Sequence, residues 1–181
     1  MNAKRTFFWI FSVWFLLLAF PCVAQESQSS SEPPKTNDTL FIAGNHDACL
    51  CNATINGLPA NVHYLCYSGV EIEGLRFWGI SMLLTDVLSG KYLSEIKCIP
   101  DGTDVLITHE PPFDILDEAD SIHYGNQELL ERVKEIMPQY HLFGHVHANY
   151  GLLKQNDVVY SNASLFSEYN QLNNPRLFLL Q

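Results

Sequence analysis

The sequence predicts an α/β fold with a mixed β-sheet, and three observations support this. Short apolar runs of the length of buried strands recur along the chain. Residues 127–140 instead repeat their apolar positions with the spacing of an amphipathic helix. This helix stands between two of the strand-like runs, so residues 104–145 are expected to form a right-handed crossover with parallel strands.

Six segments of the chain are expected to form strands. Residues 39–44 and 104–109 are apolar runs that end at Gly44 and at "EPP", whereas residues 75–81 alternate and carry aromatic side chains. Residues 141–145, 157–164 and 176–180 are the remaining strands. The helix places five apolar side chains on one face and ends at Pro138; they are Leu129, Leu130, Val133, Ile136 and Met137.

The first 38 residues differ from the rest of the chain. A basic start, "MNAKR", precedes the apolar run "TFFWIFSVWFLLLAF" and then "PCVAQ", so residues 1–24 are expected to be a secretory signal peptide. An uncleaved membrane anchor is the alternative. Residues 25–38 form a polar Ser/Pro-rich linker, and residues 39–181 form the domain. The protein is therefore expected to be secreted or extracytoplasmic, or else membrane-anchored.

The net charge bears on nucleic-acid binding, and the cysteine content bears on disulfide formation. The net charge is −10, and no cluster of Lys and Arg follows residue 5, which argues against a nucleic-acid surface. Four cysteines lie in the expected domain, and free buried thiols are expected, with two disulfides as the alternative; they are Cys49, Cys51, Cys66 and Cys98. The three N-x-[ST] sequons, at Asn37, Asn52 and Asn162, matter only where secreted chains are glycosylated.

Histidines stand where three predicted strands end. The first strand leads to Asn45, His46 and Asp47, and later strands lead to His109 and to the pair His145 and His147. Parallel neighbouring strands bring their carboxyl ends to one edge of a sheet, so these side chains are expected to meet there. Neutral imidazole and an Asn oxygen are metal ligands. The separation of His145 and His147 by one residue suits two metal ions better than one ion bound by both rings.

Other residues near the pattern have supporting roles. Gly44 and Gly144 would permit close backbone approach, and Asp47 could orient the ring of His46. Three further histidines fit no such pattern and are expected to be surface or structural residues; they are His63, His123 and His141.

The segments "GNHD", "THEPP" and "GHVHANYG", followed by "VVYSNAS", resemble the calcineurin-like metallophosphoesterase family, in its compact branch of metallophosphoesterase-domain-containing proteins. The resemblance implies a partial β-sandwich flanked by helices and a site for divalent Mn, Fe or Zn. It implies that Asn45, His109 and His145 ligate the second metal and that His147 belongs to the first. His46 would face the substrate phosphate with Asp47 behind it.

The sequence also departs from this family. The Asp-x-His and Gly-Asp segments that supply most ligands of the first metal have no counterpart before Gly44, and the first strands of the sheet are missing with them. One metal or none is therefore expected instead of two.

Three functions follow as hypotheses. The first is a metal-dependent phosphoesterase that acts on a small phosphodiester, with its catalytic competence left open. The second is a catalytically inactive secreted binding module of the same fold. The third is a disulfide-tied extracellular domain in which the histidines are incidental.

Overall fold

The computed structural model describes residues 38–50, 55–175 and 178. The strands are β1 (Thr39–Phe41), β2 (Val62–Tyr64), β3 (Ser68–Ile72), β4 (Leu75–Ile80), β5 (Val105–Thr108), β6 (Glu118–Ala119), β7 (Ile122–His123), β8 (Tyr140–Phe143), β9 (Gly151–Gln155) and β10 (Val158–Asn162). The helices are α1 (Leu84–Ser89), α2 (Lys91–Lys97) and α3 (Gln127–Ile136), with short 3-10 turns η1 (Ala48–Leu50) and η2 (His147–Asn149).

The central element is a six-stranded sheet in the order β3-β4-β5-β8-β10-β9. Its four inner strands are parallel, whereas β3 and β9 run antiparallel along the two edges. Two further strands, β1 and β2, form a separate parallel pair. The predicted mixed sheet of an α/β protein is confirmed.

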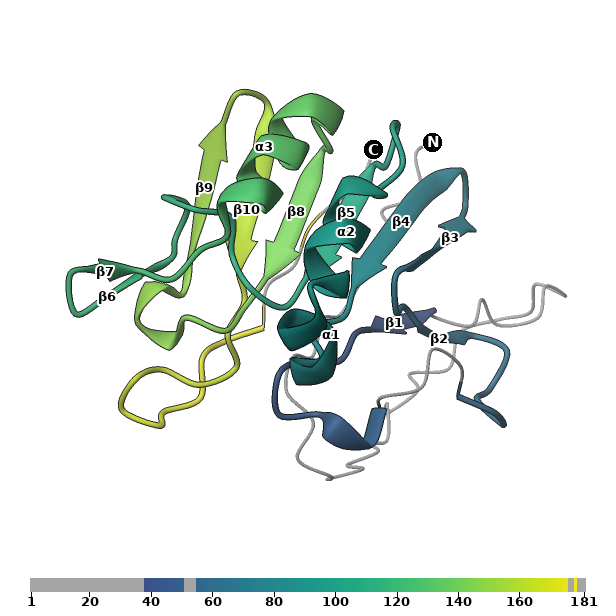
Figure 1. The fold of residues 1–181 in the computed structure, drawn as a ribbon, viewed down its shortest axis with the longest axis horizontal. Helices are drawn as coiled ribbons and strands as arrows, with labels where there is room; N and C mark the ends of the chain where they lie inside the picture. Colours follow the sequence, from purple (N-terminus) through teal and green to yellow (C-terminus); the bar gives the residue numbers. More distant parts are fainter. Residues whose placement is uncertain (1–37, 51–54, 176–177, 179–181) are drawn as a thin grey trace, which may run out of the picture.

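Helices cover one face of this sheet, and the β1–β2 pair packs on the other. Figure 1 shows α1, α2 and α3 together in front of the strands. Beneath them lies a core that includes Tyr92 and Ile96 of α2 and Leu129 of α3. On the opposite face, Leu40 and Ile42 pack with side chains of β4, β5 and β8. The arrangement is a partial sandwich flanked by helices, as the resemblance implied.

The predicted crossover between residues 104 and 145 is also present. Strands β5 and β8 are adjacent and parallel, and α3 connects them along the chain. The side chain of Asn126 caps α3 by accepting a hydrogen bond from the Leu129 amide at 2.9 Å. Met137 ends the helix in the left-handed conformation, immediately before Pro138. Because β5 and β8 are parallel neighbours, the residues that follow them emerge at the same edge.

Some predictions concern residues outside the described part of the chain. They are the leader, the linker up to residue 37, Cys51 and most of the expected strand 176–180. Of that strand only Phe178 is described, and its ring lies 5.4 Å from the ring of Tyr140. Across the described ranges, no helix has the length and apolar character that crossing a membrane requires.

The three described cysteines are free thiols, as expected for reduced residues. Only Cys66 is buried, however, and the prediction of burial was wrong for Cys49 and Cys98, which are exposed. Cys49 lies on the short turn η1, and Cys98 caps the C-terminus of α2, so neither side chain reaches the core.

Candidate functional site

Three of the predicted residues meet at the carboxyl-end edge of the sheet. His109 follows β5 directly, and His145 follows β8 after one glycine. The Gly144 amide donates to the His109 carbonyl at 3.0 Å, which holds the two strand ends together. The third residue, Asn45, lies beyond β1 on the other layer of the sandwich. The site therefore joins both layers of the fold.

The side-chain atoms of these residues are in direct contact. Nε2 of His109 lies 2.8 Å from Oδ1 of Asn45 and 3.1 Å from Nδ1 of His145. The two imidazole rings meet edge to face, with centroids 4.8 Å apart. Each of the three atoms can carry a lone pair, either in the matching tautomer of a neutral imidazole or in an amide, so the geometry gathers potential metal donors at one point.

Electrostatics keeps these imidazoles neutral. Burial, and after it the nearby His145, His46 and His147, lower the pKa of His109 to about 3. The pKa of His145 is also lowered, first by burial and then by His147 and His46. Neutral rings are the form in which histidine binds a metal ion. Four histidines thus influence one another at this edge of the sheet.

His46 and His147 are exposed and lie at the rim of the cluster. His46 belongs to the turn after β1, and His147 is the first residue of η2. Both affect the pKa of His109 and of His145, so their rings are near the cluster while their side chains face solvent. This is a suitable position for contacts with a ligand that arrives from solution.

Asp47 stabilises the turn that carries Asn45 and His46. Its Oδ2 accepts a hydrogen bond from the Gly44 amide at 2.8 Å, and its own amide donates to the Gly44 carbonyl at 3.1 Å. The carboxylate is therefore engaged with the backbone at the start of the turn, where an Asp side chain commonly caps.

The two glycines of the site differ in their surroundings. A Cβ added to Gly44 would lie 2.5 Å from Cε1 and 2.7 Å from Nδ1 of His109. A Cβ on Gly144 would lie 3.6 Å from the nearest atom, Oγ of Ser164, which is an ordinary contact. Close backbone approach is confirmed at Gly44, and Gly144 does not require it.

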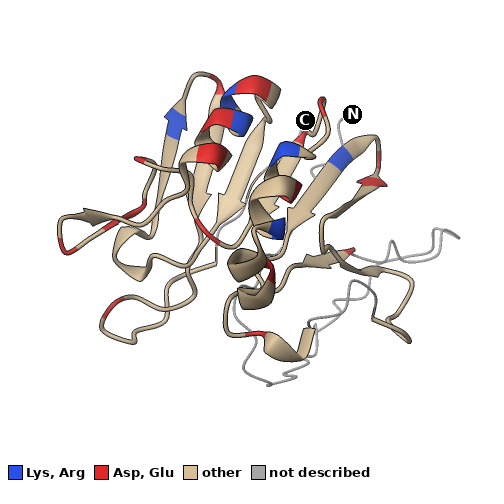
Figure 2. Ribbon diagram, viewed as in Figure 1, with Lys and Arg blue, Asp and Glu red and all other residues tan. Residues whose placement is uncertain are grey.

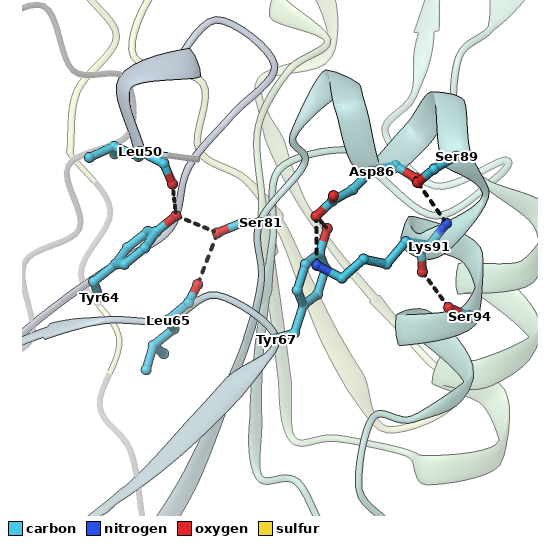
Figure 3. Close-up of polar contacts among 9 residues, drawn as sticks. All are labelled: Leu50, Tyr64, Leu65, Tyr67, Ser81, Asp86, Ser89, Lys91 and Ser94. Carbon is cyan, nitrogen blue, oxygen red and sulfur yellow. Dashed lines mark hydrogen bonds and ion pairs between the residues drawn. The ribbon is translucent and has the colours of Figure 1, made fainter. Parts of the chain in front are cut away.

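Ser81 fastens the Asn45 segment to the six-stranded sheet. Its buried Oγ accepts from the Ala43 amide at 3.0 Å and donates to the Leu65 carbonyl at 3.1 Å. Nearby, the Tyr64 hydroxyl donates to the Leu50 carbonyl at 2.8 Å (Figure 3). The sequence pattern gave no signal for Ser81, because a serine after an apolar strand is common.

The carboxyl group next to His109 points away from the cluster. Glu110 is buried toward Tyr92 of α2 and the start of α3, and this burial raises its pKa to about 7 despite interactions with Tyr92 and Asn126. Within the described ranges, no group of three or more His, Cys, Asp or Glu side chains is disposed to hold a metal ion. The candidate donor set is therefore two imidazoles and an amide, without a carboxylate.

The two separations measured from His109 Nε2 suit one divalent ion. Two donor atoms that bind one ion at about 2.0–2.2 Å lie about 2.8–3.6 Å apart, and the contacts of 2.8 and 3.1 Å around His109 Nε2 match that separation. Imidazole and amide donors suit Mn, Fe or Zn better than Ca. Without an anionic ligand, the binding is expected to be weak.

The remaining histidines have structural contacts, as predicted. His63 Nε2 lies 3.1 Å from Asp38 Oδ1, and His123 Nδ1 lies 2.8 Å from Asp117 Oδ1. His141 is fully buried in β8 against Thr108. None of these contacts involves the cluster at the strand ends.

Comparison with known proteins gives one matching family profile and several relatives. The sequence profile described as calcineurin-like phosphoesterase matches residues 11–149. The UPF0046 protein K07C11.7 of Caenorhabditis elegans is 38% identical over 158 residues, which cover 74% of this chain and 53% of that protein. Metallophosphoesterase domain-containing protein 1 of Homo sapiens is 32% identical over 139 residues, which cover 69% of this chain and 41% of that protein.

A third relative is more distant. The lariat debranching enzyme of Drosophila melanogaster is 26% identical over 157 residues, which cover 64% of this chain and 29% of that protein. The chain thus spans 53% or less of the length of these three relatives.

Proposed function

This chain belongs to the calcineurin-like phosphoesterase family, and we propose that it is a metal-dependent phosphoesterase that hydrolyses small phosphodiesters. The observation that carries the proposal is the contact of Asn45 Oδ1 and His145 Nδ1 with His109 Nε2, at 2.8 and 3.1 Å. These three residues would hold one divalent ion, and His147 would contribute to a second. A bound ion supplies charge neutralisation and lowers the pKa of a coordinated water molecule.

The residues of the chain would divide the remaining work. His46, exposed at the rim, would face the phosphate and protonate the leaving oxygen. Asp47 would keep His46 and Asn45 in place through its hydrogen bond to the Gly44 amide. Burial keeps His109 uncharged, so that its lone pair is free for a metal at neutral pH.

The charge around the site favours a diester. The segments 44–50, 109–117 and 144–149 contain no Lys or Arg. In Figure 2 the described Lys and Arg residues lie on helices and on strands β4 and β9, away from these loops. A phosphomonoester carries close to two negative charges near neutral pH, whereas a diester carries one. A site that has only metal and histidine for cationic contacts therefore suits the diester.

The test is turnover of bis(para-nitrophenyl) phosphate and para-nitrophenyl phosphate by the full chain with added manganese. We expect hydrolysis that favours the diester, that is lost with a chelator, and that falls to background in His109→Ala. His63→Gln, which removes a histidine outside the cluster, is the matched control and should retain activity. Manganese binding without any turnover would instead support the inactive binding module.

A further inference from the structure

The backbone at His145 adopts a conformation that side chains other than glycine rarely take. Its φ is +69°, and the Val146 amide donates to the Gly144 carbonyl at 2.8 Å, two residues back. This is a γ-turn with His145 at its centre and at positive φ, which costs conformational energy. The turn sets the direction in which the imidazole leaves the backbone, so an additional interaction is needed to maintain it.

Asn162 provides that interaction from the end of β10. Its side chain is fully buried, and Nδ2 donates to the Val146 carbonyl at 2.8 Å and to the Leu116 carbonyl at 3.1 Å. Val146 stands between His145 and His147, so the first bond fixes the segment that carries both rings. The second bond attaches the loop that follows His109 to the same side chain.

The oxygen of the Asn162 side-chain amide also accepts two hydrogen bonds. Oδ1 accepts from the Ser164 amide at 3.1 Å and from the Ser164 hydroxyl at 2.7 Å. An amide has two donor hydrogens and two acceptor lone pairs, and all four are used here. The side chain therefore has one orientation only. It also lacks a free, exposed nitrogen for the glycan that its sequon suggested.

We propose that Asn162 is a positioning residue that holds the His145 γ-turn in the orientation in which Nδ1 meets His109. The proposal for Asn162 rests on the proposed function, because it assumes that the aligned imidazoles bind a metal. Partners that orient metal ligands typically change metal affinity about 10–100-fold when they are removed. The amide and hydroxyl of Ser164 donate to the opposite side of the same amide, at Asn162 Oδ1, and not to the carbonyl groups of the turn.

The experiment compares the full wild-type chain with Asn162→Ala and Ser164→Ala. Manganese affinity is measured by titration calorimetry, and the His109 and His145 imidazole signals are measured by NMR without metal. We expect Asn162→Ala to lose affinity about tenfold or more and to shift both imidazole signals. Ser164→Ala, a matched loss of a buried hydrogen bond, should stay within about twofold with unchanged signals.

Four outcomes would overturn or redirect the inference. Unchanged affinity and signals in Asn162→Ala overturn it, and so do equal changes in Ser164→Ala, which would indicate general loosening. If Asn162→Ala does not fold, Asn162→Asp, which retains size and the Ser164 contacts, takes its place under the same criteria. If wild type binds no manganese, the proposed function fails and the metal-free imidazole signals alone decide on Asn162.

Discussion

Ser81 and Ala43 are joined by a hydrogen bond of 3.0 Å inside the protein, between a side-chain hydroxyl and a backbone amide 38 residues away. Next to it, the Met82 amide donates to the Ala43 carbonyl at 2.9 Å. Both polar groups of Ala43 are thus bound by the segment that follows β4. Because Asn45 comes two residues later, this attachment fixes how far Asn45 reaches toward His109.

Replacing Ser81 with Ala should destabilise the protein by about 1–3 kcal/mol, because the Ala43 amide and the Leu65 carbonyl would lose a buried partner. Urea unfolding of the full chain measures this. The matched control is Ser89→Ala, which removes the exposed hydroxyl contact to Asp86 in α1 (Figure 3) and should stay within about 0.5 kcal/mol. Equal effects of the two variants would contradict the role given to Ser81.

Replacing Gly44 with Ala should displace the ring of His109, since the new methyl group would lie 2.5 Å from Cε1. We expect manganese binding to fall by about 10-fold or more, as for loss of a group that orients a ligand. Gly144→Ala is the control, because its methyl group would have its nearest neighbour at 3.6 Å. Calorimetric titration of both variants checks the difference. Retention of wild-type affinity in Gly44→Ala would show that His109 does not need its present place.

Asp47 can be tested for a catalytic as opposed to a positional role. Asp47→Asn retains a side-chain oxygen that can accept from the Gly44 amide, whereas Asp47→Ala does not. If the carboxylate only holds the turn, Asp47→Asn should keep turnover and manganese affinity near wild type, and Asp47→Ala should lower both. Steady-state kinetics with the diester separates them. An Asp47→Asn variant as impaired as Asp47→Ala would mean that the negative charge itself is required.

Local patterns predicted the parts of the fold that are buried and regular. The alternation at β4, the apolar runs at β5, β8 and β10 and the spacing in α3 were sufficient, because each of these elements has a buried face. Edge strand β9 was missed, since its residues are mostly exposed and Leu152 and Leu153 follow each other without alternation. Helices α1 and α2 were missed because each is only two turns long, with few buried residues.

At the candidate site, too, some features could be predicted from the sequence and others could not. His109 and His145 were predicted to meet because β5 and β8 are parallel neighbours whose carboxyl ends share one edge. Asn45 was also predicted to lie there, but it reaches His109 from β1, which is not a strand of the same sheet. The γ-turn at His145 could not be predicted, since Asn162, which donates to its Val146 carbonyl, lies 16 residues beyond Val146 on strand β10. The role of Ser81 could not be predicted either, because its partner, the Ala43 amide, belongs to the other layer of the sandwich. Long-range polar contacts of this kind leave no periodic pattern in a sequence.

His141 is a buried histidine whose tautomer is determined by its hydrogen-bonded neighbours and whose neutral state is determined by burial. Thr108 donates its hydroxyl hydrogen to the Glu110 carbonyl at 2.7 Å, so Nε2–H of His141 donates to Thr108 Oγ1 at 2.9 Å. Nδ1 of His141 then carries the lone pair, and among the described residues it has no hydrogen-bond partner. Burial lowers the pKa of His141 to about 3, so the ring is neutral throughout the physiological range.

Acid should therefore destabilise the protein in part through His141. Below pH 6.5, the ordinary pKa of histidine, this residue is protonated in the unfolded chain but stays neutral in the folded chain until about pH 3. The contribution of His141 to the free energy of unfolding therefore decreases as the pH falls from 6.5 to 3. Below about pH 6, the decrease in the free energy of unfolding due to His141 approaches about 1.4 kcal/mol per pH unit. Urea unfolding of His141→Leu should show a loss of stability between pH 7 and pH 5 that is smaller than the wild-type loss by about 2 kcal/mol in total. His123→Gln serves as the opposite control, because Asp117 raises the pKa of His123, so removing it should make the loss of stability on acidification steeper. A slope that does not change in His141→Leu would mean that the buried ring accepts a proton in the folded protein.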